Sequence, residues 1–381
     1  MRIAFVVQRY GLDVHGGSEA LCRIWAEHLA ARHQVTVFTT CARDYLTWAD
    51  HYPPGSEELN GVIVRRFPVD APRDLDTFNE FTHQVYANRG DLALGEEWMR
   101  RQGPYSTPLF EAIVAERDDF ARFVFMTYLY ATAYFGLPLV ADKALLAPTA
   151  HDEPPIYLGI FRQLFALPQG FLFLMPSEEL LVRRLFPTEH IPGYEVGLEV
   201  PLDPEPQAEP LNDLPELLYI GRVHPSKNVD QLAADFARYR EEGGKPARLL
   251  VAGRVDTPMP EHPDIAYLGY VDEARKRELL RRCALLVLPS IYESLSIVLL
   301  EAWAHGRPTL VNGAAPVLRE QTLRGGGGLF YHGYAEFVVA LDTLLADRSL
   351  RAALGGQGRA FVARRYTWTA VDTTLERALN A

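Results

Sequence analysis

The sequence contains few cysteines and no long apolar run, and these two absences exclude several classes of protein. Only 3 of its 381 residues are cysteine. Cys22, Cys41 and Cys283 are too few and too far apart for a disulfide framework or a cysteine-based metal site. The apolar stretch that follows Met1 is too short for a signal peptide. No stretch provides the roughly 20 apolar residues that a membrane-spanning helix needs. We therefore expect a protein of the reducing cytoplasm.

Positive charge is also in short supply. The chain has 38 lysines and arginines against 49 acidic residues, which gives a formal net charge of −11. This balance argues against nucleic acid as a partner, because nucleic-acid binding depends on a basic face. It leaves open a nucleotide-sized ligand that a few well-placed cations could hold.

The familiar nucleotide-binding fingerprints are missing as well. Gly11 is misplaced for a Gly-x-Gly-x-x-Gly motif, and no P-loop sequence occurs. No Ser–His–Asp or Cys–His arrangement stands out. A nucleotide site in this chain must therefore be built from other residues.

In the first half of the chain, short apolar runs alternate with amphipathic stretches. This alternation predicts an α/β fold with a parallel sheet that is covered on both faces. We predict helices at residues 18–32 and 111–117, and strands at 3–8, 34–39, 61–66, 122–128, 144–148 and 171–175. Residues 68–108 give no clear pattern.

A stretch rich in proline and acidic residues follows, between about residues 193 and 215, and reads as a linker. The β/α alternation then restarts. The predicted strands are 216–220, 247–252, 265–268, 285–288 and 309–312, and the predicted helices are 229–241, 272–282, 297–305 and 334–346. Residues 350–381 are helical with a break near Tyr366. We expect a first domain at 1–195, a linker at 196–213, a second domain at 214–360 and a last helix at 361–381.

The most informative segment is the one that contains Glu293 and Glu301. A buried strand at 285–288 is followed by a polar loop and then by a helix that begins near Ile297. This order places the helix N-terminus at the carboxyl end of a parallel strand, where open α/β sheets bind ligands. Backbone N–H groups near Ser294, Leu295 and Ser296 would attract anions and sugar oxygens.

Two cations follow the first strand of the second domain, in the segment Gly221-Arg222-Val-His-Pro-Ser-Lys227-Asn228. Arginine binds phosphate oxygens in a bidentate manner, and lysine supplies a compact charge. The segment lies at the same sheet edge as Ile297, so these cations could neutralise a diphosphate. The alternative is a solvated loop in which Lys227 merely starts a helix.

The first domain offers two weaker candidates. Gly16 and Gly17 open the first helix, where a backbone without side chains could approach a ligand closely. The alternative is a glycine-rich turn capped by Ser18. His151 ends a predicted strand and could bind a sugar hydroxyl, or it could be a turn residue before two prolines.

Two further patterns favour structural explanations. Asp74 and Asp76 match the Asp-x-Asp pattern of metal-dependent enzymes, but no second ligand cluster lies near them in the sequence, so we expect two surface carboxylates. The run of glycines at 325–328 resembles a phosphate cradle, but we expect a flexible or ligand-adjacent turn there.

Taken together, the motifs resemble those of the retaining GT-B glycosyltransferases of family four, the glycosyl transferases of group 1. The resemblance rests on Gly221-Arg222-x4-Lys227-Asn228, on Glu293-x7-Glu301-Ala, and on Gly306-x-Pro308. Gly16-Gly17, His151 and Ser177 extend it over nearly the whole chain. It implies two Rossmann-like domains that face a central cleft. The second domain would bind the nucleotide-sugar donor, the first would bind mainly the acceptor, and the last helix would cross back to the first domain.

The resemblance also implies roles for the charged residues. Arg222 and Lys227 would bind the donor diphosphate, Glu301 the ribose hydroxyls and Glu293 the hydroxyls of the transferred sugar. His151 would contact that sugar near its 6-hydroxyl. Such enzymes usually need no metal and no other cofactor.

Backbone contacts to the donor would come from several short segments. They are Gly16-Gly17 at the diphosphate, Tyr270-Val271 at the base, and Ser294, Leu295, Ser296 and Ile297 at the sugar and phosphates. Many family members have Gly-Phe-Gly where this chain has Ser294-Leu295-Ser296. The identity of the sugar therefore does not follow from the resemblance.

The function that we expect is the transfer of a hexose from a nucleoside-diphosphate sugar to an acceptor hydroxyl, with an α-linked product. The acceptor would be a polysaccharide, a lipid-linked glycan or another glycan. A nucleotide-sugar epimerase on the same fold and a catalytically silent nucleotide- or glycan-binding protein are the alternatives.

Acceptor contacts are expected from the first domain, and the candidates are Tyr128, Tyr130, Asp152 and residues 96–105. A lipid-linked acceptor would place the protein at the inner face of the membrane. The pairs Arg100-Arg101 and Arg183-Arg184 are too sparse to indicate this, and they favour a solvated surface.

Overall fold

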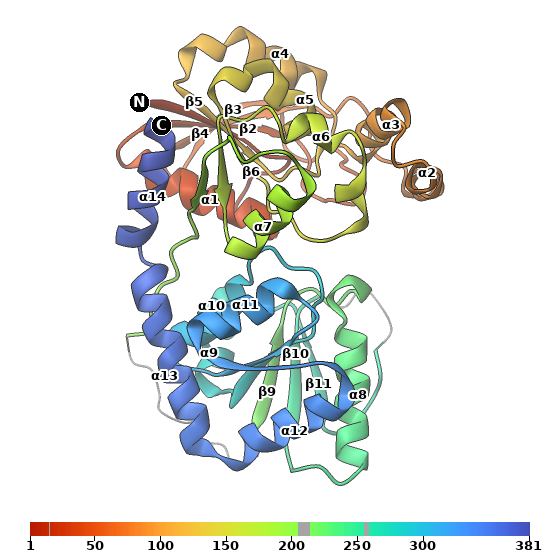
Figure 1. The fold of residues 1–381 in the computed structure, drawn as a ribbon, viewed down its shortest axis with the longest axis vertical. Coiled ribbons are helices and arrows are strands. Elements are labelled where there is room, and N and C mark those ends of the chain that lie inside the picture. The colour runs from red at the N-terminus through yellow and green to blue at the C-terminus, as the bar shows by residue number, and fades with distance from the viewer. Residues whose placement is uncertain (15, 205–213, 255–258) are drawn as a thin grey trace. The chain divides into compact units, whose positions relative to one another are not determined.

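The chain forms two compact units, each built around its own sheet (Figure 1). The computed structural model describes every residue except 15, 205–213 and 255–258. The first unit comprises residues 1–198 and 372–381, and the second comprises residues 199–371. Much of the predicted linker, residues 205–213, lies outside the described residues.

The sheet of the first unit has eight strands in the order β3-β4-β2-β1-β5-β6-β7-β8. All of its pairs are parallel except β3 with β4. The strands are β1 (Arg2–Val6), β2 (Gln34–Thr40), β3 (Gly55–Leu59), β4 (Val62–Phe67), β5 (Arg122–Met126), β6 (Ala144–Ala147), β7 (Gly170–Phe173) and β8 (Gly193–Glu195). The helices are α1 (Gly17–Ala30), α2 (Leu75–Ala87), α3 (Leu92–Gln102), α4 (Thr107–Ala115), α5 (Ala131–Gly136), α6 (Phe161–Leu164) and α7 (Pro176–Leu185).

The sheet of the second unit has six strands, all parallel, in the order β11-β10-β9-β12-β13-β14. The strands are β9 (Glu216–Ile220), β10 (Arg248–Ala252), β11 (Ile265–Gly269), β12 (Leu285–Leu288), β13 (Thr309–Asn312) and β14 (Gly328–Tyr331). The helices are α8 (Val229–Glu241), α9 (Glu273–Arg282), α10 (Ile297–Ala304), α11 (Pro316–Gly325), α12 (Gly333–Ala346) and α13 (Arg348–Arg365).

Each sheet contains one point at which the strand order reverses. In the first unit it lies between β1 and β5, and in the second unit between β9 and β12. Ligands of open α/β sheets bind beside the carboxyl ends of the strands at such a point. The predicted α/β fold is confirmed, and the loops after β1, β5, β9 and β12 are the places to look for a site.

Two strands lie where the sequence did not predict them. β8 lies at the start of the stretch that we interpreted as a linker. It has only three residues, which pair with β7 at the edge of the sheet, and so short a strand gives no clear apolar pattern. β3 is an exposed edge strand that contains Glu57 and Glu58 and lacks the apolar alternation of a half-buried strand. The unreadable residues 68–108 contain α2 and α3.

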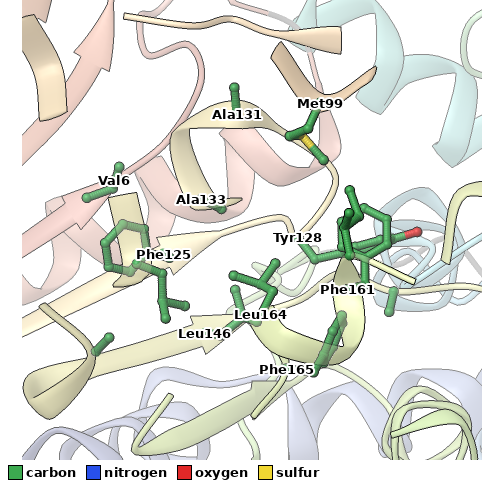
Figure 2. Close-up of a cluster of buried hydrophobic side chains, with 14 of the residues drawn as sticks. Val6, Met99, Phe125, Tyr128, Ala131, Ala133, Leu146, Phe161, Leu164 and Phe165 are labelled. Atoms are coloured by element: carbon green, nitrogen blue, oxygen red, sulfur yellow. The ribbon is translucent and has the colours of Figure 1, made fainter. Parts of the chain in front are cut away.

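Aromatic side chains fill much of the core of the first unit. Figure 2 shows Tyr128 beside Phe161 and Phe165, with Phe125 and Leu146 in the same cluster. The Tyr128 and Phe161 rings meet edge to face with centroids 4.8 Å apart. This cluster fixes the ends of β5 and β6, from which Tyr128 and His151 follow.

The last helix, α14 (Trp368–Asn380), returns to the first unit from Asp372 onwards. Nε2 of His28 on α1 lies 2.7 Å from Oδ1 of Asp372, and Nη2 of Arg32 donates to the same oxygen at 2.8 Å. Figure 1 shows α14 beside α1. The end of the chain is thus held by polar contacts to the first helix.

Two glycines of the run at 325–328 pack against the side chain of Trp303. A Cβ atom on Gly325 or Gly327 would collide with the indole ring of Trp303, and so would one on Gly358 of α13. The Trp303 indole is fully buried, and its Nε1 donates to the Gly327 carbonyl at 2.9 Å. These glycines make room for a large side chain.

Candidate functional site

The loop after β9 begins at a tight approach of two backbones. Gly221 and Gly253 both have a φ of +153°, a conformation that L side chains rarely adopt. A Cβ atom on Gly253 would collide with the Gly221 carbonyl oxygen. The Tyr219 hydroxyl donates to the Arg222 carbonyl at 2.9 Å and so fixes the next turn of the loop. The Arg222 side chain therefore starts from a rigid backbone.

Lys227 and Glu293 contact each other. Nζ of Lys227 lies 2.7 Å from Oε1 of Glu293, and both side chains are partly buried. Lys227 ends a 3₁₀ turn (Pro225–Lys227), and the left-handed Asn228, with φ 56°, then starts α8. The ion pair joins the loops after β9 and β12, which are the two strands at the reversal point of the sheet. It therefore lies where the fold predicts a ligand.

Two amides hold the end of β12. The Nδ2 atoms of Asn228 and Asn312 both donate to the Pro289 carbonyl, at 3.4 and 3.0 Å. The loop that contains Glu293 thus begins at a fixed position.

The N-terminus of α10 differs from the prediction in one respect. The Ser296 backbone N–H donates to Oε1 of Gln321 at 3.1 Å, and the Gln321 amide donates back to the Ser296 carbonyl. We predicted that this N–H group is available to bind an anion. That prediction is wrong, because the Gln321 side chain of α11 already accepts its hydrogen bond. The side chains of Leu295 and Ser296 are buried, whereas those of Ser294 and Ile297 are partly exposed.

Glu301 lies one turn into α10 and is also paired. Its Oε1 is 2.7 Å from Nζ of Lys276 on α9. Burial raises the pKa of the Glu301 carboxyl, and the Lys276 ammonium opposes that shift. Burial would lower the pKa of Lys276, but the Glu301 and Glu273 carboxylates together outweigh it, and the net shift is upward. Each member of the Lys276–Glu301 pair thus favours the charged form of the other.

Tyr270 and Val271 follow β11, the outermost strand on one side of the sheet. The Tyr270 side chain is 66% exposed, directly after Gly269 with its φ of +66°. An exposed ring next to a ligand-binding edge is suited to stacking on a base.

In the first unit, Gly16 and Gly17 differ in their surroundings. A Cβ atom on Gly16 would collide with the Glu19 carboxylate, whereas a Cβ atom on Gly17 would meet nothing within 4 Å. Glu19 is buried and accepts from Nε of Arg9 at 2.8 Å. The Arg9–Glu19 pair thus fixes the turn at Gly16, and Gly17 faces open space.

His151 belongs to a network of acidic groups. Its Nε2 lies 3.2 Å from Oε2 of Glu153, whose other oxygen accepts from the Tyr128 hydroxyl at 2.9 Å. The carboxylate of Glu178 accepts the backbone N–H groups of Ala150 and Leu174, at 2.7 and 2.8 Å. Glu178 therefore ties the His151 loop to the end of β7.

The structure changes the prediction for the acceptor residues. Tyr128 has no exposed surface, and its ring lies in the aromatic core, so direct contact with an acceptor is not supported. Tyr130 packs edge to face on Trp48, with ring centroids 5.4 Å apart. Asp152 is exposed and accepts from the Tyr157 hydroxyl at 2.6 Å.

Asp74 has a structural role, because its carboxylate caps α2 by accepting from the Thr77 N–H. Among the described residues, no group of three or more histidine, cysteine or acidic side chains could hold a metal ion. Likewise, no helix within the described ranges is long and apolar enough to cross a membrane.

Sequence reasoning missed Lys276, Gln321 and Glu178. Lys276 and Glu301 are 25 positions apart, and Ser296 and Gln321 are equally far apart. No spacing rule pairs residues on different helices at such a distance. For Glu178 the sequence offers one signal, its position directly after Ser177. The structure shows that its side chain is buried.

Comparison with known proteins agrees with this geometry. Residues 214–347 match the family described as "Glycosyl transferases group 1". Over the whole chain, the sequence is 23% identical to an uncharacterized glycosyltransferase of Methanocaldococcus jannaschii, of which it covers 97%. Several further curated relatives match less than half of the chain.

Solved structures share the fold across both units. Sucrose-phosphate synthase from Thermosynechococcus elongatus superimposes with a TM-score of 0.75 at 18% identity, covering 100% of this chain and 98% of that one. Anabaena HepE in complex with UDP-glucose gives a TM-score of 0.70 at 14% identity, with 100% of both chains covered.

Two Rossmann-like sheets, with charged loops at the reversal point of the second, define the GT-B fold that the solved structures share. Within the second unit, residues 214–347 are similar to the glycosyl transferases of group 1.

Proposed function

We propose that the protein is a retaining hexosyltransferase, which moves a hexose from a nucleoside-diphosphate sugar to an acceptor hydroxyl and forms an α-linkage. The observation that carries this proposal is the Lys227–Glu293 pair at the reversal point between β9 and β12. It places a cation for phosphate and a carboxylate for sugar hydroxyls side by side. The binding of UDP and glucose by the structurally similar HepE supports a donor of this class.

In this proposal Arg222 and Lys227 bind the donor diphosphate. An ammonium group has three N–H donors, and the contact with Glu293 uses one of them, so two remain for phosphate oxygens. Glu293 keeps an oxygen for the sugar hydroxyls, and Glu301 binds the ribose. Tyr270 and Val271 contact the base.

The proposed chemistry is departure of the leaving group on the face that the acceptor attacks. The bond between the anomeric carbon and the phosphate oxygen breaks, and the negative charge that develops on the phosphate is stabilised by Arg222 and Lys227. The departing phosphate oxygen takes the proton of the acceptor hydroxyl. In this mechanism neither Glu293 nor Glu301 is a nucleophile or a general base, because the departing phosphate takes the proton and both carboxylates serve as hydroxyl acceptors.

The acceptor is a glycan or a lipid-linked glycan, and Tyr130 and Asp152 are its proposed contacts in the first unit. A cytoplasmic location, at the inner face of the membrane when the acceptor is lipid-linked, is part of the same proposal.

The first test is the anomer of the product. Binding of UDP, GDP and ADP, followed by their hexose derivatives, identifies the donor through the rise in Tm that a ligand of the folded state causes. The sugar released from that donor to water, or to an acceptor, is then examined by NMR. An α-linked donor should give an α product, and a β product would refute retention. Conversion of the donor into its epimer, without transfer or hydrolysis, would indicate a nucleotide-sugar epimerase. Binding without any turnover would indicate a catalytically silent binding protein.

The second test addresses the cations. Arg222→Ala and Lys227→Ala should each reduce kcat/KM by at least ~10–100-fold, because each removes a charge-assisted contact that strengthens in the transition state. Arg319→Ala and Lys245→Ala are matched controls, since both side chains are exposed and lie outside the proposed site. Near-normal activity of both site variants would overturn the phosphate roles.

A further inference from the structure

Lys276 lies in the second turn of α9 and contacts two carboxylates. Its Nζ is 2.7 Å from Oε1 of Glu301 and 2.9 Å from Oε2 of Glu273. The two partners differ in exposure, because the Glu273 side chain is 72% exposed and the Glu301 side chain only 22%. Lys276 itself is 16% exposed. The contact with Glu301 is therefore the buried part of this network.

The Lys276 ammonium favours the charged form of the Glu301 carboxylate. Glu301 lies between the buried residues Leu300 and Ala302, and burial disfavours a carboxylate. Of the charged groups on α9, Lys276 and Arg277 favour the ionised form and Glu273 opposes it, and only Lys276 makes contact. On its own helix the nearest titratable group is His305, whose ring nitrogen bonds to the Glu301 carbonyl. From α13, Arg359 reaches the Ala304 carbonyl, not the carboxylate.

The contact also orients the carboxylate. Lys276 binds Oε1, while Oε2 has no hydrogen-bond partner among the residues that the structure describes. A carboxylate held by one oxygen presents the other in a fixed direction, which lowers the entropy cost of binding a hydroxyl.

We propose that Lys276 is a positioning residue, which holds the Glu301 carboxylate charged and oriented so that it accepts the hydroxyls of the donor ribose. This inference rests on the proposed function, in which Glu301 is the ribose contact. It makes the recognition of ribonucleotides over deoxyribonucleotides depend on a side chain of α9 that does not itself touch the ligand.

The test is a calorimetric comparison of ribonucleoside and 2′-deoxyribonucleoside diphosphates, using UDP with dUDP, GDP with dGDP, and ADP with dADP. The wild-type protein should prefer the ribo form of the nucleotide that it binds by roughly tenfold, the value of one charge-assisted hydrogen bond at the lower end of its range. Glu301→Gln and Lys276→Met should both reduce this preference to about threefold or less.

A second readout separates positioning from a general structural effect. Loss of Lys276 removes the charge that favours the Glu301 carboxylate, so ribonucleotide binding by Lys276→Met should weaken at a higher pH than in the wild type as the solution is acidified. Lys276→Arg should restore both the preference and the wild-type pH dependence. Glu273→Gln is the matched control, because it removes an exposed partner of the same ammonium. It should leave the ribose preference unchanged, and binding should not weaken at a higher pH than in the wild type, since the Glu273 carboxylate opposes ionisation of Glu301.

The outcomes distinguish the two levels of the proposal. If Glu301→Gln loses the ribose preference but Lys276→Met keeps it, the role of Lys276 is overturned and the proposed function stands. If Glu301→Gln also keeps the preference, the ribose role of Glu301 is wrong and the inference fails, while hexosyl transfer is not affected. If the wild-type protein binds none of the nucleotides, the proposed function itself fails and the inference with it. Should Lys276→Met not fold, Lys276→Gln, which keeps a hydrogen-bond donor but not the charge, is expected to show the same shift in pH dependence.

Discussion

At the scale of single residues, the candidate site of the second unit is organised as contacts between opposite charges. Lys227 meets Glu293, and Lys276 meets Glu301. Each carboxylate in the motif thus has a lysine from a different element of the same unit. Each of these contacts involves one carboxylate oxygen, so the other oxygen is positioned to accept a hydroxyl group without proton transfer.

The first prediction concerns the coupling between Lys227 and Glu293. Lys227→Met and Glu293→Gln should each destabilise the protein, because each leaves a partly buried group without its partner. The double variant should be less destabilised than the sum of the two, with a coupling free energy of about 1 kcal/mol. Urea unfolding of the four proteins measures this value. Strict additivity would show that the two side chains do not interact in solution.

The second prediction concerns Glu178. Burial raises the pKa of the Glu178 carboxyl to about 7, above its ordinary value of 4.5, although three backbone N–H groups and His151 oppose the shift. The folded protein therefore binds a proton that the unfolded chain has released between these two pH values, so the free energy of unfolding should fall as the pH rises from about 4.5 through 7.

Glu178→Gln should flatten this part of the pH profile, as measured by Tm between pH 5 and 8. It should also lower the maximum Tm, because an amide can accept only one of the two N–H groups that the carboxylate accepts. Glu58→Gln, at an exposed position, is the control. An unchanged pH profile in Glu178→Gln would contradict the shifted pKa.

Sequence patterns singled out Lys227, Glu293 and Glu301 as candidates. They did not reveal Lys276, the partner of Glu301. Glu293 and Lys227 follow neighbouring apolar strands, and the carboxyl ends of parallel strands meet at one edge, so their proximity could be predicted. Lys276 could not be placed, since its contact with Glu301 depends on how α9 packs beside α10. The Ser296 N–H was predicted to be available because the sequence does not show that Gln321 of α11 reaches it.

At the scale of helices and strands, prediction succeeded where the buried pattern is clear. β9, β12 and β13 have the predicted bounds because their apolar runs are short and end at turn-forming residues. α8 has the predicted bounds because its buried residues form one helical stripe. β3 and α2 were missed for the opposite reason. β3 is exposed and acidic, and only two residues of α2, Phe78 and Val85, are buried, too few to produce a clear helical stripe.

The third prediction concerns the attachment of α14 to α1. Asp372→Ala removes the partner of both His28 and Arg32 and should lower the free energy of unfolding by about 1 kcal/mol, since these contacts are partly exposed. Hydrogen exchange of residues 372–380 should increase more than that of the sheet. Asp118→Ala, whose carboxylate is 92% exposed, is the control. Unaltered exchange would show that apolar packing alone holds α14.

At the scale of the whole molecule, two units with separate sheets share one chain, which leaves the first unit after Leu198 and returns at Asp372. The effect of a bound ligand on hydrogen exchange can therefore be measured separately in each unit. The family match and the charged pairs of the motif both lie in the second unit.

The fourth prediction follows from this division. A nucleoside diphosphate that raises the Tm should protect backbone amides from exchange most strongly at residues 221–228, 269–276 and 293–301. Residues 55–67, at the far edge of the first sheet, should be unaffected and serve as an internal control. Protection confined to the first unit would contradict the assignment of the donor site.

Trp303 and the glycines around it have a consequence for how this sequence can change. The indole occupies space that side chains at Gly325, Gly327 and Gly358 would need, and these glycines come from α11, its C-terminal turn and α13. A substitution at any one of the four positions alters what the other three can tolerate. The four residues should therefore evolve as a group: a smaller residue at 303 would permit alanine at the glycines, whereas alanine introduced first would be selected against. Since α10 contains both Trp303 and Glu301, this dependence also limits how freely the proposed ribose contact, Glu301, can be repositioned over evolutionary time.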